Sequence, residues 1–240
     1  LIMPTSGTTT FSISRDDIIK RAYRLLGVTS AGQTPSTDLV SDASFALNTL
    51  VKAWQADGMP LWAIRSYSVP LTDGDATYTI GNGQTVNTPK PLKLTQAFNH
   101  DSVSDVDIPM RILTRQEYNM LGNKTSSGNP IQIFYDPQRT YGILSVFPVP
   151  TSTEATNNTI VIHYQRPFED FNASTDELDF PQEWFDAVCY GLACRLAPEA
   201  GISSTDRKQL WQEMTIIKNE ALGFGTEEGS IHFTASLRNW

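Results

Sequence analysis

The sequence predicts an α+β fold: a four-helix bundle formed by N- and C-terminal helical pairs, with an inserted, mainly antiparallel β domain and an extended C-terminal tail. Apolar residues recur at spacings of three and four near both ends of the chain, as in amphipathic helices. Between them, short segments rich in β-branched and aromatic residues alternate with turn residues. After residue 223 the chain is polar, with isolated large apolar residues.

The first helical pair is expected within residues 13–65, after a flexible arm of residues 1–12 that is rich in Thr and Ser. Ser14 and Asp17 resemble a capping box at the start of the first helix, and Gly27 ends it. The second helix runs from about Asp38 to Asp57. Because both helices are amphipathic and closely connected, we expect an antiparallel hairpin.

The inserted β domain is expected at residues 66–170. Its strand candidates are 66–71, 77–80, 92–98, 106–113, 131–135, 142–147 and 159–165. Asp73 and Gly74 predict a hairpin turn between the first two strands. Thr114 with Glu117 predicts a capped short helix, whereas residues 148–158 lack periodicity and predict a loop.

The second helical pair is expected at residues 171–223, where it completes the bundle. Pro181 stands at the start of its first helix, where the missing N–H costs nothing. Its last helix begins near Ser204 or Thr205. The apolar stripe of that helix is Leu210, Met214, Ile217 and Ala221. Residues 224–240 form the tail.

Composition limits the classes of function. The chain has 240 residues, of which 40% are hydrophobic and 18% charged, with a formal net charge of -8, so it is globular and acidic. An acidic chain does not bind DNA over its whole surface, but it can line a passage through which DNA slides. Cys189 and Cys194 predict reduced, buried thiols made in a cytoplasm. We expect no membrane span and no signal peptide.

Catalytic and metal-binding patterns are weak. The three histidines are far apart and stand in no metal-ligand spacing, so we expect no metal and no cofactor. Adjacent carboxylates occur at residues 169–170, 176–179 and 227–228. A glycoside hydrolase needs two carboxylates that flank one sugar bond, one of them with a raised pKa. Carboxylates adjacent in a loop are more typical of a solvated surface, so we expect no enzyme.

Two groups of residues are candidate docking surfaces. The basic residues of the first helix form either a solvated face or a docking face for an acidic partner or neighbouring subunits. They are Arg15, Lys20, Arg21 and Arg24. The apolar residues of the tail either fold back onto their own domain or dock into a groove of another protein. They are Phe224, Ile231, Phe233, Leu237 and Trp240.

Several motifs resemble the head-to-tail adaptors of short-tailed bacteriophages, also called connector, packaged-DNA stabilisation or head-completion proteins. The opening segment carries Leu47-x-x-Leu50-Val51-x-x-Trp54 and then Asp57-Gly58-x-Pro60-Leu61-Trp62. The closing segment carries Tyr164-x-Arg166-Pro167, Phe180-Pro181-x-x-Trp184-Phe185-x-Ala187-Val188 and Leu192-Ala193-x-Arg195-Leu196-Ala197-Pro198. Each motif is degenerate, and their order and spacing along most of the chain carry the resemblance.

The resemblance implies a structural subunit of a ring, commonly of twelve copies, in the neck of the virion. Such a ring docks under the portal protein, extends the DNA channel, helps retain the packaged genome and holds a tail nozzle or tail tube protein, with tail fibres as further partners. The C-terminal extension that reaches the portal corresponds here to residues 225–240. Two alternatives stay open: a virion-associated peptidoglycan hydrolase, and a glycan- or protein-binding tail module.

Overall fold

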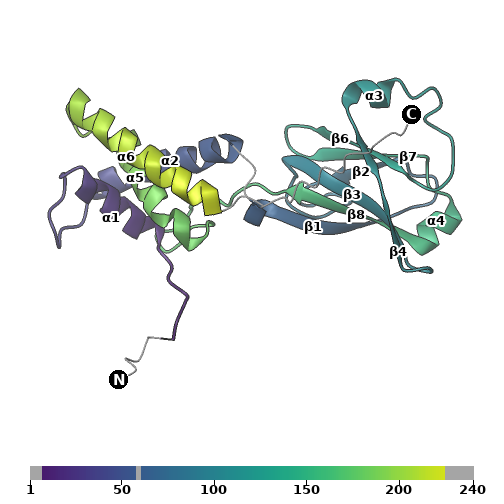
Figure 1. Ribbon diagram of the computed structural model, residues 1–240, viewed down its shortest axis with the longest axis horizontal. Coiled ribbons are helices and arrows are strands. Elements are labelled where there is room, and N and C mark those ends of the chain that lie inside the picture. The colour runs from purple at the N-terminus through teal and green to yellow at the C-terminus, as the bar shows by residue number, and fades with distance from the viewer. Residues whose placement is uncertain (1–6, 58–60, 225–240) are drawn as a thin grey trace, which may run out of the picture. The chain divides into compact units, whose positions relative to one another are not determined.

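The computed structural model describes residues 7–57 and 61–224. The chain divides into two compact units, one of Leu1–Ala53 with Asp170–Trp240 and the other of Trp54–Glu169. The first unit is helical in its described part and the second holds all the described strands (Figure 1). Each unit has its own set of buried apolar side chains.

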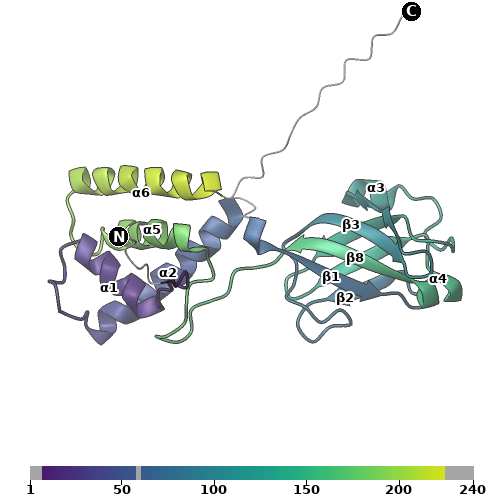
Figure 2. The same cartoon turned by 60° about the horizontal axis from the view of Figure 1, so that its bottom comes forward.

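Four helices form the helical unit: α1 (Arg15–Leu25), α2 (Thr37–Asp57), α5 (Phe185–Leu196) and α6 (Ser204–Phe224). Helix α5 packs against both α1 and α6, and Figure 2 shows it running beside α6. Eight of its side chains are buried, so α5 is the centre of this unit. They are Phe185, Ala187, Val188, Cys189, Gly191, Leu192, Ala193 and Leu196. From α1, the hydroxyl of Tyr23 donates to the carbonyl of Leu39 in α2 at 2.9 Å.

The start of α1 is tied to the segment that precedes α5. Ser14 caps the helix, since its hydroxyl accepts from the N–H of Asp17 at 3.3 Å. The N–H of Arg15 donates to the carbonyl of Asp176 at 2.8 Å. In the same segment Phe171 exchanges two hydrogen bonds with the Asn48 side chain, at 2.9 and 3.0 Å. These bonds hold the long connection into α5 against α1 and α2.

The β unit consists of two four-stranded sheets, ordered β1-β8-β3-β4 and β2-β7-β6-β5. The first contains β1 (Ile64–Pro70), β8 (Asn158–Gln165), β3 (Lys93–Asp101) and β4 (Val106–Pro109). The second contains β2 (Thr77–Ile80), β7 (Gly142–Phe147), β6 (Gln132–Pro137) and β5 (Arg111–Leu113). Pairing is antiparallel except between β5 and β6.

One apolar core is shared by the inward faces of the two sheets. It contains Val69, Ile160 and Ile162 from the first sheet and Ile80, Leu144 and Ile133 from the second. Alternate residues of β8 are buried, which is the period of two expected for a strand with one face on a core. The short helices α3 (Arg115–Asn119) and α4 (Ser152–Asn157) and the 3₁₀ turns Leu61–Ala63 and Gln182–Trp184 complete the described elements.

The prediction of a four-helix bundle formed by helical pairs is wrong. The described chain is α+β, with six α-helices and two four-stranded sheets, and α5 is the helix on which α1 and α6 both pack. In a bundle each helix buries an apolar stripe along its length. Helix α6 buries only Ala221, while Trp211 and Ile216 are 58% and 59% exposed. Spacing alone does not show whether another element covers an apolar stripe.

Three local predictions within the β unit also fail. The first two strands do not form a hairpin, because β1 pairs with β8 and β2 with β7 in the other sheet. The predicted strand 106–113 is divided into β4 and β5, one in each sheet. The predicted loop after Pro148 contains α4, which begins with a capping box of Thr151 and Glu154. Thr114 and Glu117 form the predicted capping box at α3.

Candidate docking surfaces

Arg15 is separated from the other basic residues of α1. Its side chain is 14% exposed and donates to the carboxylate of Asp16 at 2.9 Å and to the carbonyl of Asn172. These bonds occupy the guanidinium within its own subunit. Arg15 therefore contributes to the fold of the loop before α5 and offers little to an external partner.

Lys20, Arg21 and Arg24 form the basic face of α1. Spacings of three and four residues place Lys20, Arg21 and Arg24 on the side opposite the buried Ile18, Ile19 and Ala22. Lys20 lies 3.8 Å from Asp17, an exposed pair of little energetic weight. Arg21 and Arg24 are exposed and pair with no carboxylate among residues 7–57 and 61–224.

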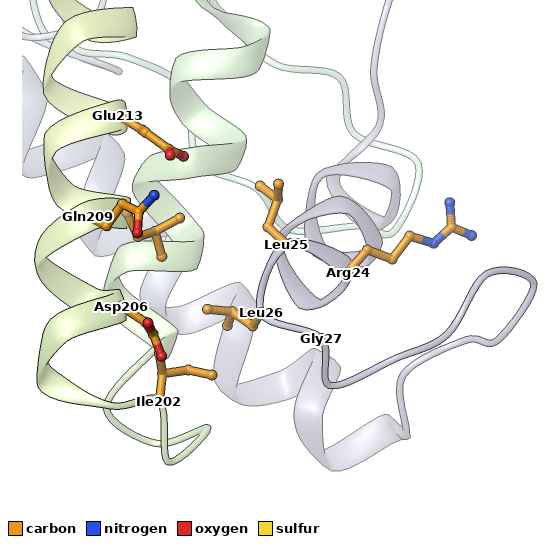
Figure 3. A pocket seen from close by; sticks show the side chains of 9 residues that line it. Arg24, Leu25, Leu26, Gly27, Ile202, Asp206, Gln209 and Glu213 are labelled. Atoms are coloured by element: carbon orange, nitrogen blue, oxygen red, sulfur yellow. The ribbon is translucent and has the colours of Figure 1, made fainter.

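A groove of about 410 Å³ separates the C-terminal end of α1 from the first turns of α6. Figure 3 shows Asp206 and Glu213 pointing from α6 toward this groove, whereas Arg24 extends from the other side of α1, away from α6. Its remaining lining is Leu25, Leu26, Gly27, Ile202, Gln209 and Leu210. The groove is therefore apolar on the α1 side and acidic on the α6 side.

Asp206, Glu213 and Glu220 form the acidic row of α6. They stand seven residues apart, so they follow one line along the exposed surface of the helix. Ser203 caps α6, because its hydroxyl accepts from the N–H of Asp206 at 3.2 Å and donates to the Asp206 carboxylate at 2.7 Å. Glu213 and Glu220 pair with no base in the described part of the chain. The spacing of seven is present in the sequence, but the apolar periodicity that predicts the helix does not reveal it.

Helix α6 ends at Phe224, whose side chain is 82% exposed. Phe224 is the only tail residue of the predicted docking set that falls among the described residues. The other four, Ile231, Phe233, Leu237 and Trp240, lie outside them. The tail assignment therefore stays a prediction.

The two cysteines are not nucleophiles at neutral pH. Burial and the neighbouring Asp186 raise the pKa of the Cys189 thiol to about 12. Burial and the neighbouring Glu213 raise the pKa of the Cys194 thiol to about 11. Because the thiolate is the reactive form, both groups are inert while the helical unit is folded.

Asp176, from the acidic loop considered for hydrolysis, has the wrong environment for a general acid. Its carboxylate accepts from the N–H groups of Ala173 and Asn172 at 2.6 and 2.7 Å, and these bonds hold its pKa below the ordinary value. A glycosidase acid needs the opposite shift. Asp170 pairs with Lys52 at 2.7 Å. Among the residues described, no three His, Cys, Asp or Glu side chains gather as metal ligands.

Comparison with known families decides the identity of the chain. The model of the SU10 adaptor protein family matches residues 13–226, which covers both units. The chain belongs to the SU10 adaptor protein family. No curated protein matches it. Membership makes this SU10 adaptor protein a structural component of a bacteriophage neck, associated with portal and tail components. The resemblance to head-to-tail adaptors is thereby confirmed.

No described helix of the SU10 adaptor protein has the length and hydropathy needed to cross a membrane.

Proposed function

We propose that this SU10 adaptor protein forms a ring, of twelve copies, that docks under the portal and extends the DNA channel. The family match over residues 13–226 carries the proposal. The ring helps to retain the packaged genome, and its β units provide the platform for a tail nozzle or tail tube protein and for fibres. DNA passes through the lumen without sequence-specific binding, in keeping with a net charge of -8.

The portal anchor in this proposal is the segment that follows α6. Phe224 at the end of α6 is 82% exposed, so this end of the helix leaves a large apolar side chain uncovered within the described subunit. The four further apolar side chains of the segment are Ile231, Phe233, Leu237 and Trp240. An apolar segment that orders in a groove of a partner gains binding energy from its large side chains.

Deletion of residues 225–240 tests the anchor. We expect the shortened chain to fold, with unchanged hydrogen exchange in α5 and β8, and to lose most of its binding to the cognate portal ring. A full-length variant with Ile231, Phe233, Leu237 and Trp240 replaced by Ser separates apolar contact from chain length. Deletion of residues 1–6 is the matched control. Portal binding equal to that of the intact chain would exclude this anchor.

A further inference from the structure

The subunit presents two exposed surfaces of opposite charge on different helices. The basic face of α1 has three basic side chains, of which Lys20 lies 3.8 Å from the carboxylate of Asp17. The acidic row of α6 has three carboxylates. Within the described part of one subunit no ion pair joins the two surfaces. Figure 3 shows why Arg24 forms no ion pair with the acidic row: its side chain points away from the groove that Asp206 and Glu213 face.

We propose that the acidic row of α6 binds the basic face of α1 from a second copy of this chain. The proposal rests on the ring proposed above and names the surfaces through which its copies meet. A contact between two different surfaces of identical subunits is heterologous, and repetition of one such contact generates a ring when the rotation closes. Charge complementarity then sets the order and orientation of neighbouring copies.

The basic face of α1 is shorter than the acidic row of α6. Asp206 and Glu220 are 14 residues apart in α6, which corresponds to about 21 Å along the helix axis. Lys20 and Arg24 span little more than one turn of α1. In the proposed contact the basic face meets the row around Glu213, the carboxylate that also lines the groove. The groove of about 410 Å³ beside Glu213 also contains apolar side chains, Leu25, Leu26 and Leu210, against which the aliphatic stems of the long basic side chains can pack.

A charge exchange tests the contact in the full-length protein. Variant A carries R21E and R24E, and variant B carries E213K and E220K. Asp206 is retained because its carboxylate and its N–H both bond the hydroxyl of Ser203, which caps α6. Each variant alone places like charges across every heterologous contact. We expect copy–copy association on the cognate portal ring to weaken about tenfold or more in each, since two charges of one surface are reversed.

Mixing A with B restores opposite charges in an alternating arrangement, and so does a chain that carries all four substitutions. We expect both to load onto portal rings as cooperatively as the unmodified chain, measured by native mass spectrometry across a concentration series. Variant C carries R207E and K208E, which change the net charge as much as variant A does but lie on α6 away from the acidic row. It should load normally. Raising the ionic strength should weaken loading of the unmodified chain, because salt screens exposed charges.

The outcomes separate this inference from the proposed function. If the unmodified chain fails to load onto portal rings, both are excluded. If it loads cooperatively and variants A and B load equally well, the ring stands and the charge contact is excluded. If A and B fail and neither the mixture nor the four-substitution chain recovers, opposite charge between these surfaces is not the cause and the inference is excluded.

Discussion

Replacement of Leu192 by Ala should destabilise the helical unit and leave the β unit unchanged. Leu192 lies in α5 and is 0% exposed, so the change removes three buried carbon groups. At about 0.8 kcal/mol for each group the lost transfer free energy is about 2.4 kcal/mol. The cavity adds to this cost, and we expect a loss of about 3–4 kcal/mol in the free energy of unfolding, within the range for buried Leu→Ala changes.

Amide hydrogen exchange followed by mass spectrometry checks this prediction in the full-length chain. A loss of about 3 kcal/mol accelerates exchange through unfolding of the helical unit about 100-fold. Peptides from α5 should show this acceleration, while peptides from β8 keep their protection because the units have separate cores. L222A is the matched control, since Leu222 is 38% exposed. Unchanged exchange in α5, or an equal loss in β8, would refute the reasoning.

Three further predictions concern single buried groups. N99A should lower the free energy of unfolding of the β unit by about 1–3 kcal/mol in urea denaturation. The Asn99 amide donates to the Pro130 carbonyl at 3.1 Å, and its removal leaves that carbonyl without this donor. An unchanged denaturation midpoint would contradict the prediction. G142A should cost about 1–3 kcal/mol in the same assay, because the new Cβ would overlap the Tyr135 ring, and stability equal to the unmodified chain would show that the ring moves freely. The Cys189 thiol, with a pKa of about 12, should resist iodoacetamide at pH 8 until urea is added. Folding raises the pKa of this thiol, so the stability that its neutral form contributes is present below the unfolded pKa near 9 and is lost as the pH rises toward the folded value. Rapid labelling of Cys189 in the folded chain would contradict its burial.

Local patterns predicted the elements that depend on nearby residues. Ser14 and Thr114 mark the starts of α1 and α3 because a cap satisfies N–H groups within one turn of the cap itself. Thr151 and Glu154 have the same spacing at the start of α4, but residues 148–158 lack the apolar periodicity that would predict a helix there. Pairing of β1 with β8 was not predictable in this way, since it joins residues about 100 positions apart.

Some features of the docking surfaces are predictable from local sequence, and others depend on the tertiary structure. The charges of Lys20, Arg21 and Arg24 and their common side of α1 follow from helix spacing alone. Arg15 carries the same charge, but the tertiary structure places its guanidinium against the carbonyl of Asn172, in addition to the local bond to Asp16. The packing of α6 on α5 is tertiary structure, and it places Asp206 and Glu213 at the groove beside α1.

The sequence by itself determined the positions of five of the six described helices and of most strands, the acidic charge and the resemblance to phage adaptors. Those properties depend on residue type and on contacts a few positions apart. Only the tertiary structure decided that α5 is the central helix, that two sheets share one core, and that Trp211 and Ile216 remain exposed. An apolar stripe requires a covering surface but does not identify it, because burial is non-directional.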